Sequence, residues 1–138
     1  MKMTIVGHGF VGKAVDFGFS DRSITKTIID PLYDITLDEV KLNEDVTFVC
    51  VPTPMGKDGS IDCSIVVDTV TKLLLRRSGI IVIKSTVTPD VIEKFARRGG
   101  GVRVVYNPEF LTEKNACEDF VNPSMHIFGG KEEATERL

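Results

Sequence analysis

The strongest constraint on the fold lies in the first residues, where an apolar run leads directly into a glycine-rich turn. Gly7, Gly9 and Gly12 follow the apolar run in a G-x-G-x-x-G spacing. Such glycines allow a tight turn from strand to helix and a close approach to a pyrophosphate, which the first amides of the helix then face. Asp30 ends the next apolar run, where a carboxylate suits the ribose hydroxyls of a dinucleotide. The spacing alone also fits a turn without a ligand.

Short apolar runs alternate with amphipathic segments along the rest of the chain. Strands are expected at residues 3–6, 24–29, 46–51, 80–83, 102–106 and 125–128. Helices are expected at residues 10–19 and 37–42, from an Asp62 cap to Gly79, and from a Thr88 cap to Gly99. Continuous apolar strands separated by amphipathic helices predict an α/β fold, a doubly wound parallel sheet of the Rossmann-like kind.

Ligands bind such sheets outside the carboxyl ends of the strands, and polar residues lie where the expected strands end. They are Asp30, Thr53, Lys84, Ser85, Thr86, Asn107 and Glu109. Simpler structural explanations exist: Thr53 stands between two prolines and can be a stiff strand exit. Ser85 and Thr86 can begin a turn, and Lys84 can reach solvent along its aliphatic stem. Their convergence on one edge of the sheet favours a binding site.

Two carboxylates, Glu109 and Glu113, are four residues apart in the segment N-P-E-F-L-T-E. If this segment is helical, both lie on one face. There they could hold a substrate and transfer a proton or activate water. Two solvent-exposed acids are the alternative explanation.

Length and composition narrow the possible classes. The chain has 138 residues, a length that suits one domain over residues 1–138. Its net charge of −3 gives no reason to expect nucleic acid or an anionic membrane as partner. No apolar stretch can span a bilayer and no signal peptide is evident, so a cytoplasmic location is expected. Cys50, Cys63 and Cys117 lack metal-binding spacing; free thiols and no metal site are predicted.

Several motifs together resemble one enzyme family. They are G-H-G-F-V-G at 7–12, V-P-T-P at 51–54, K-S-T-V at 84–87 and, most specific, N-P-E-F-L-T-E at 107–113 with Ala116, Asp119, Pro123 and Gly129 in step behind it. On these motifs the chain resembles the UDP-glucose/GDP-mannose dehydrogenase family. The resemblance covers essentially the whole chain but only the N-terminal, NAD-binding portion of the family.

That family oxidises the C6 hydroxyl of a nucleotide sugar to a carboxylate with two NAD per turnover, through a cysteine thiohemiacetal and a thioester. The resemblance implies NAD as cofactor and a nucleotide sugar such as UDP-glucose as substrate, and it leaves a homo-oligomer open. Asp30 independently favours NAD over NADP, because its charge repels a 2′-phosphate.

The resemblance also implies roles for individual residues. The residues implied for NAD are Gly7, Gly9, Phe10, Val11, Gly12, Asp30, Thr53, Thr86 and Glu113. The residues implied for the nucleotide sugar are Glu109, Phe110, Leu111, Thr112 and Glu113. The implied catalytic residues are Thr86 and Glu109, which orient or activate the water that attacks the thioester, and Glu113 near the nicotinamide.

The chain departs from the family in several respects. Thr112 stands where a small residue or Arg is usual, and Met125 where Arg is common, which weakens an anionic contact. The helix-favouring residues 131–138 end without a C-cap and are expected to lead into a missing second domain. The family's nucleophilic cysteine lies in such a later domain, and no thioester forms without it. Weak NAD binding without turnover is therefore predicted. Two alternatives stay open: a non-catalytic NAD-binding module acting through a partner chain, and another small Rossmann dehydrogenase.

Overall fold

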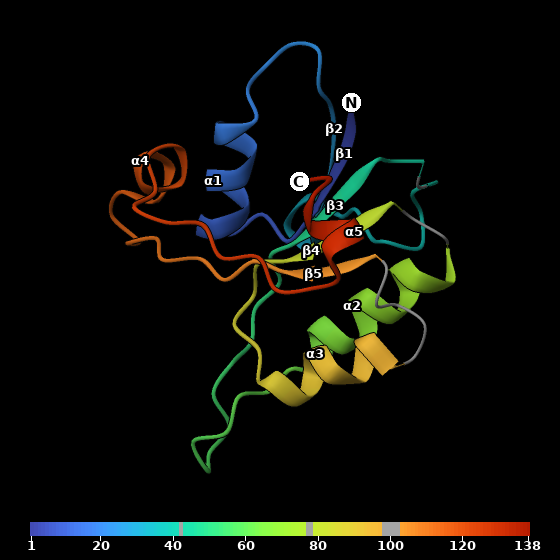
Figure 1. The fold of residues 1–138 in the computed structure, drawn as a ribbon, viewed down its shortest axis with the longest axis vertical. Coiled ribbons are helices and arrows are strands. Elements are labelled where there is room, and N and C mark those ends of the chain that lie inside the picture. The colour runs from blue at the N-terminus through green and yellow to red at the C-terminus, as the bar shows by residue number, and fades with distance from the viewer. Residues whose placement is uncertain (42, 77–78, 98–102) are drawn as a thin grey trace.

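The chain folds around a five-stranded parallel sheet with helices on both faces (Figure 1). The computed structural model describes residues 1–41, 43–76, 79–97 and 103–138. The strands are β1 (Lys2–Val6), β2 (Thr25–Ile29), β3 (Val46–Val49), β4 (Ile80–Ile83) and β5 (Val104–Tyr106), in the order β2-β1-β3-β4-β5 with all neighbours parallel. The predicted doubly wound sheet is confirmed. Its strand order reverses between β1 and β3, which is where such sheets bind ligands.

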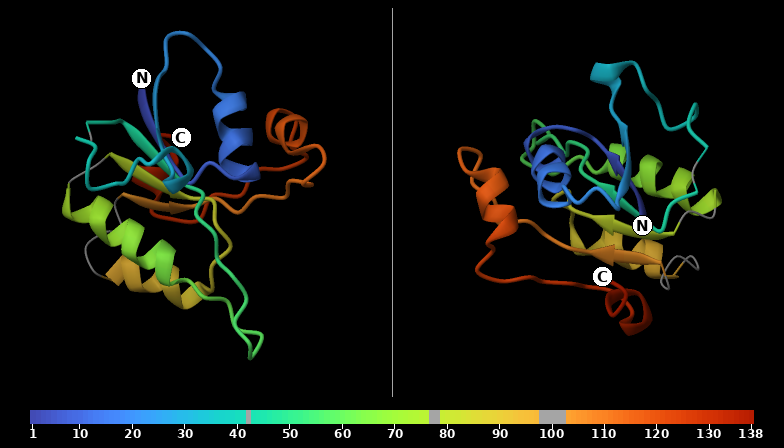
Figure 2. Two further views of the ribbon diagram at one scale, coloured as in Figure 1. Left: turned by 180° about the vertical axis from the view of Figure 1, so that it is seen from behind. Right: turned by 90° about the horizontal axis from the view of Figure 1, so that it is seen from above.

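Helices cover the sheet in two layers. On one face lie α1 (Phe10–Gly18), α4 (Ala116–Val121) and the short α5 (Glu132–Thr135); on the other lie α2 (Ser64–Leu75) and α3 (Pro89–Phe95). Figure 2 shows α1 and α4 side by side on one flank of the sheet, away from the pair formed by α2 and α3. Among the described residues no helix has the length and apolarity needed to cross a membrane.

Burial on both faces explains why β4 and β5 are apolar at every position rather than at alternate ones, and why even the polar Thr4 of β1 and Thr47 of β3 are buried. In β4, Ile81 and Ile83 pack against α2 and α3, whereas Ile80 and Val82 pack on the α1 side. All four residues are at most 3% exposed. The same alternation runs through β1, β3 and β5, so the sheet separates two apolar cores.

The connection from β2 to β3 differs from the expectation. The helix predicted at residues 37–42 is wrong: the described part of this segment forms turns, and Leu42 lies outside the described residues. The Glu39 carboxylate accepts hydrogen bonds from the amide and hydroxyl of Thr36 at 2.8 and 2.6 Å, which closes a tight turn. Leu37 and Val40 still reach the core beside α2. A single turn is therefore enough to bury the apolar residues whose spacing suggested a helix.

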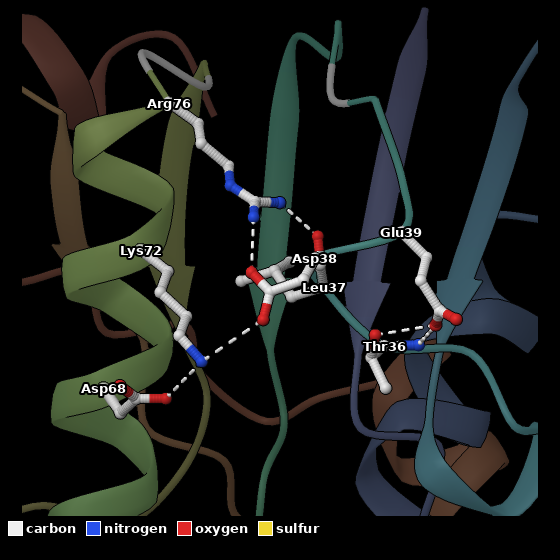
Figure 3. Close-up of polar contacts among 7 residues, drawn as sticks. All are labelled: Thr36, Leu37, Asp38, Glu39, Asp68, Lys72 and Arg76. Atoms are coloured by element: carbon white, nitrogen blue, oxygen red, sulfur yellow. Dashed lines mark hydrogen bonds and ion pairs between the residues drawn. The ribbon is translucent and has the colours of Figure 1, made fainter.

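Charged side chains fasten this connection to α2 (Figure 3). The Arg76 guanidinium donates to the carbonyl of Leu37 and to the carboxylate of Asp38. Lys72 Nζ lies 3.7 Å from the same carboxylate and 3.0 Å from that of Asp68, and these neighbours raise the Lys72 pKa, Asp68 most. The contacts compensate for the absence of a packed helix in the described part of the connection.

Strand and helix ends account for the remaining differences. The strand predicted at 125–128 is wrong: Met125, Ile127 and Phe128 are more than 40% exposed, and the segment meets the sheet through one antiparallel bridge from Gly129 to Tyr106. The strand predicted at 46–51 ends at Val49, and β5 begins at Val104. Residue 102 and the glycines 99–101, expected to end α3, lie outside the described residues.

The Arg76 contacts predict a measurable contribution to stability. Replacing Arg76 with Met should lower the free energy of unfolding by roughly 1–2 kcal/mol, because the Leu37 carbonyl loses a charged donor. Arg97→Met is the matched control, since Arg97 pairs with Glu93 at 3.1 Å on an exposed surface and should contribute less than about 0.5 kcal/mol. Urea unfolding of both variants provides the comparison. Equal losses would show that Arg76 does not hold the connection.

Candidate dinucleotide site and the adjoining cavity

A cavity of about 580 Å³ opens at the carboxyl ends of the strands, where the strand order reverses; we call it the glycine-loop cavity. It is lined by Gly7, Gly9, Phe10, Val11, Asp30, Pro31, Leu32, Cys50, Val51, Pro52, Thr53, Lys84, Ser85, Thr86 and Glu109. The structure thus brings together the glycine turn, Asp30, Thr53, Thr86 and Glu109, as their places at strand ends suggested. Gly12 lies behind the lining and Glu113 outside it.

The three glycines of the turn meet different constraints. Gly7 has a φ of +89°, and a Cβ there would lie 2.6 Å from the carbonyl oxygen of Cys50, so only glycine fits between β1 and β3. A Cβ on Gly12 would lie 2.0 Å from the Gly7 oxygen, which holds α1 close to the turn. Gly9 faces open space, since a Cβ at this position would have no atom within 4 Å of it. A ligand can therefore approach the backbone at Gly9 without obstruction.

The carboxylate of Asp30 is held at the end of β2 by two backbone amides. The amide of His8 donates to Oδ2 at 2.6 Å, and that of Leu32 donates to Oδ1 at 2.8 Å. Asp30 is 8% exposed, and each oxygen retains a further lone pair. The His8 ring lies outside the cavity lining, with Nδ1 2.8 Å from the Tyr33 hydroxyl. His8 thus joins the glycine turn to Asp30 through its backbone.

The exits of β3 and β4 form the opposite part of the lining. The Ser85 hydroxyl donates to the carbonyl of Val51 at 2.7 Å and ties the two exits together, so this hydroxyl already has a structural partner. Thr53 is half-buried and Thr86 is exposed to the cavity. Both are therefore open to a ligand, although their predicted contacts with NAD stay predictions.

A second cavity of about 260 Å³ adjoins the first, and we call it the α4 cavity. It is lined by Lys84, Asn107, Pro108, Glu109, Phe110, Leu111, Thr112, Asp119, Phe120, Asn122, Pro123, Ser124, Met125 and His126. Lys84 and Glu109 line both cavities, so the two share a wall at the ends of β4 and β5. Four of the residues predicted to hold the nucleotide sugar, Glu109 to Thr112, lie here.

The segment from 107 to 112 is not helical, so Glu109 and Glu113 do not share a helix face. The Glu109 carboxylate accepts a hydrogen bond from the Leu111 amide at 2.7 Å. Thr112 donates through its amide and hydroxyl to Asp119 at 2.8 and 2.6 Å, and these bonds lower the Asp119 pKa. Glu113 is exposed and lines neither cavity.

Sequence reasoning missed the part played by Lys84. The alternative that its side chain reaches solvent is wrong, because Lys84 is 5% exposed, and burial lowers its pKa. Its Nζ donates to Asn107 Oδ1 at 3.0 Å. The K-S-T and N-P-E motifs place both residues just after strands, but no sequence signal showed that the two side chains meet. Leu32, which lines the glycine-loop cavity and is 84% exposed, was also missed.

Comparison with known proteins agrees with this geometry. The model of the UDP-glucose/GDP-mannose dehydrogenase family, NAD binding domain, matches residues 32–138. UDP-glucose 6-dehydrogenase from Rickettsia felis is 29% identical over 178 aligned positions, which cover 100% of this chain and 40% of that protein. Its counterpart from Haloferax volcanii is 30% identical over 177 positions, covering 95% and 41%. The chain thus spans about two fifths of the length of these relatives.

Solved structures show the same fold. The UDP-glucose dehydrogenase of Pyrobaculum islandicum is 26% identical with a TM-score of 0.73, and the match covers 99% of this chain and 42% of that one. A ternary complex of GDP-mannose dehydrogenase from Pseudomonas aeruginosa is 22% identical with a TM-score of 0.77, over 100% and 43%. The family match begins after the glycine turn and Asp30, which the structure itself places at the cavity. The chain belongs to the NAD-binding domain family of the UDP-glucose/GDP-mannose dehydrogenases.

Proposed function

We propose that residues 1–138 form one NAD-binding domain of a nucleotide-sugar 6-dehydrogenase, with NAD in the glycine-loop cavity and UDP-glucose reaching the α4 cavity. The observation that carries this proposal is the meeting of Gly9, the start of α1 and the Asp30 carboxylate at the reversal of strand order. A cytoplasmic location belongs to the same proposal, because scattered free thiols are typical of that compartment.

The chain's own residues fit the parts of NAD. The first amides of α1 have no partner within the helix and would face the pyrophosphate beside Gly9. Asp30 would accept hydrogen bonds from the ribose hydroxyls. Thr53 follows β3 and Thr86 follows β4, so both lie across β1 from Asp30 at the end of β2. They would contact the other half of the NAD molecule. NAD supplies a hydride acceptor when bound.

The shared wall suits the chemistry of the sugar. Glu109 lines both cavities, and with Thr86 it would orient water or hold a proton near the C6 position. Phe110, Leu111 and Thr112 would contact the nucleotide sugar. The proposed roles of Glu113 beside the nicotinamide and the sugar require a side-chain position different from the one seen here.

For this chain alone we propose binding without oxidation of UDP-glucose. Although Cys50 lines the glycine-loop cavity, burial of its thiol raises the pKa to about 12, against the opposing effect of nearby Lys84. Cys63 is buried and Cys117 lines neither cavity. None of these thiols is placed as a reactive thiolate, which a thioester requires.

Gly9→Ala tests the cofactor site most cleanly. The added methyl meets no protein atom, and the Gly9 φ of −70° suits alanine, so the fold should be unaffected. The methyl would nevertheless occupy the space that a pyrophosphate needs, and the NAD dissociation constant measured by calorimetry should rise at least about tenfold. Gly129→Ala is the control, since its Cβ would make ordinary 3.8 Å contacts outside both cavities. Unchanged NAD affinity in Gly9→Ala would contradict the site.

Asp30→Asn tests the choice of cofactor. Removing the charge should weaken NAD binding and reduce the preference for NAD over NADP by about tenfold, because a 2′-phosphate is no longer repelled. Asp34→Asn is the control, since it removes one exposed charge four residues away. Melting temperatures identify any loss of folding, because Asp30 also holds two amides. A preference that changes equally in both variants would refute the role of Asp30.

The raised pKa of Cys50 predicts low reactivity. Cys50 and Cys117 are both half-buried, yet at pH 8 iodoacetamide should modify Cys50 at least about tenfold more slowly than Cys117, because few Cys50 thiols are ionised. Peptide mass mapping over time gives both rates, and labelling in urea serves as the unfolded reference. Similar rates for both thiols in the folded protein would show that Cys50 is accessible and ionised.

A further inference from the structure

Lys84 occupies the wall between the two cavities. It follows β4 directly, and its amide donates to the carbonyl of Val49 at 2.9 Å, so the backbone is held in register with the sheet. The residue is 5% exposed, yet it lines both the glycine-loop cavity and the α4 cavity. A lysine is rarely buried to this extent without a paired charge.

The surroundings of Lys84 compensate its charge only in part. Its Nζ donates to Asn107 Oδ1 at 3.0 Å and lies 5.5 Å from the centre of the Phe120 ring. Within the described residues no carboxylate lies within 4.0 Å of this ammonium. Burial lowers the pKa of Lys84, while nearby Cys50 and Glu109 act in the opposite direction. Burying an ammonium in these surroundings costs free energy, so we look for a specific role of Lys84 that offsets this cost.

Lys84 determines how the Asn107 amide is oriented. An ammonium can only donate hydrogen bonds, so the amide oxygen of Asn107 must face Lys84 and the amide nitrogen must face the other way. There Nδ2 donates to the carbonyl of Ile127 at 2.8 Å. Asn107 is 6% exposed, and its backbone amide donates to the carbonyl of Ile83 at 2.9 Å. The two side chains thus form a directed chain from the end of β4 to the segment 122–128.

The segment 122–128 is joined to this chain by the hydrogen bond from Asn107 to Ile127. Its residues 122–126 form one wall of the α4 cavity, but Met125 is 57% exposed and Ile127 44%, so apolar burial holds the segment weakly. Beyond Ile127, two hydrogen bonds of 2.7 Å join Gly129 and Tyr106 at the edge of β5. A segment whose apolar side chains are largely exposed can open at a low energetic cost, so each of these hydrogen bonds matters to its position.

We propose that Lys84 is a positioning residue for the α4 cavity, acting through Asn107 to hold the 122–128 wall against the sheet before a ligand enters. The proposal deepens the proposed function, which it needs only for the identity of the ligand. Lys84 would therefore affect binding in the α4 cavity more than NAD binding in the glycine-loop cavity.

The first test uses amide hydrogen exchange in the protein without ligand. Lys84→Met keeps the length and apolar stem but removes the donor, so the Asn107 amide loses its fixed orientation. The Gly129 and Tyr106 amides, which report on the attachment of the wall, should exchange about tenfold faster. Amides of β1 should be unchanged, as should both regions in the exposed control Lys94→Met. Global stability alone would not decide the matter, because replacing a buried lysine can raise it.

Asn107→Asp separates this role from a simple need for charge compensation. The new carboxylate would keep Lys84 paired, but it has no N–H to donate to Ile127. It should therefore reproduce the faster exchange at Gly129, whereas the remote exposed Asn43→Asp should not. Unchanged Gly129 exchange in either Lys84→Met or Asn107→Asp would overturn the proposal. If Lys84→Met fails to fold, Asn107→Asp alone decides it.

Calorimetry with UDP-glucose and NAD provides the ligand arm. In both variants the UDP-glucose dissociation constant should rise at least about tenfold, while in Asn107→Asp, whose side chain lies outside the glycine-loop cavity, that of NAD should stay within about twofold. Equal losses for the two ligands in Asn107→Asp would contradict a role specific to the α4 cavity. If the unaltered chain binds no UDP-glucose, the proposed function fails in its substrate, and the exchange experiment still decides the role of Lys84.

Discussion

The contact between Gly7 and the carbonyl of Cys50 is the constraint on which the rest of the site depends. It lies just beyond the ends of β1 and β3, where the strand order reverses, and it leaves no room for a side-chain carbon on Gly7. This close approach lets α1 begin at Phe10 beside the sheet edge, with Gly9 facing open space. The parallel ladder then brings the ends of β2, β4 and β5 to the same edge, so one local contact organises both cavities.

A few specific side-chain contacts fix the β2–β3 connection and the position of α4. In the described part of the β2–β3 connection a tight turn, together with Lys72 of α2 and Arg76 just after it, replaces a packed helix. On the opposite face, the Phe120 ring packs where a side chain on Gly18 would lie 2.3 Å from it, which brings α4 against α1. Both arrangements adjoin cavity walls. The β2–β3 connection begins directly after Asp30, which lines the glycine-loop cavity, and α4 carries Asp119 and Phe120, which line the α4 cavity.

Much of the fold could be predicted because its signals are local. The glycine turn, the apolar strands and Asp30 each follow from steric or burial rules that act within a few residues. The failures have a common cause: the patterns at 37–42 and 125–128 fit a helix and a strand, yet tertiary contacts decide the conformation of residues 37–41 and 125–128. Leu37 needs only one turn to reach the core, and Ile127 is held by the side chain of Asn107. The burial of Lys84 likewise arises from residues distant in sequence.

The central claim is that the pyrophosphate of NAD lies over the first turn of α1. Titration of the ¹⁵N-labelled chain with NAD, followed by amide chemical shifts, tests it most directly. The account predicts saturable shifts at Gly9, Phe10, Val11 and Leu32, with small changes at α2 and α3. Saturable shifts confined to the α4 cavity, or no shifts at the glycine turn at millimolar NAD, would contradict it.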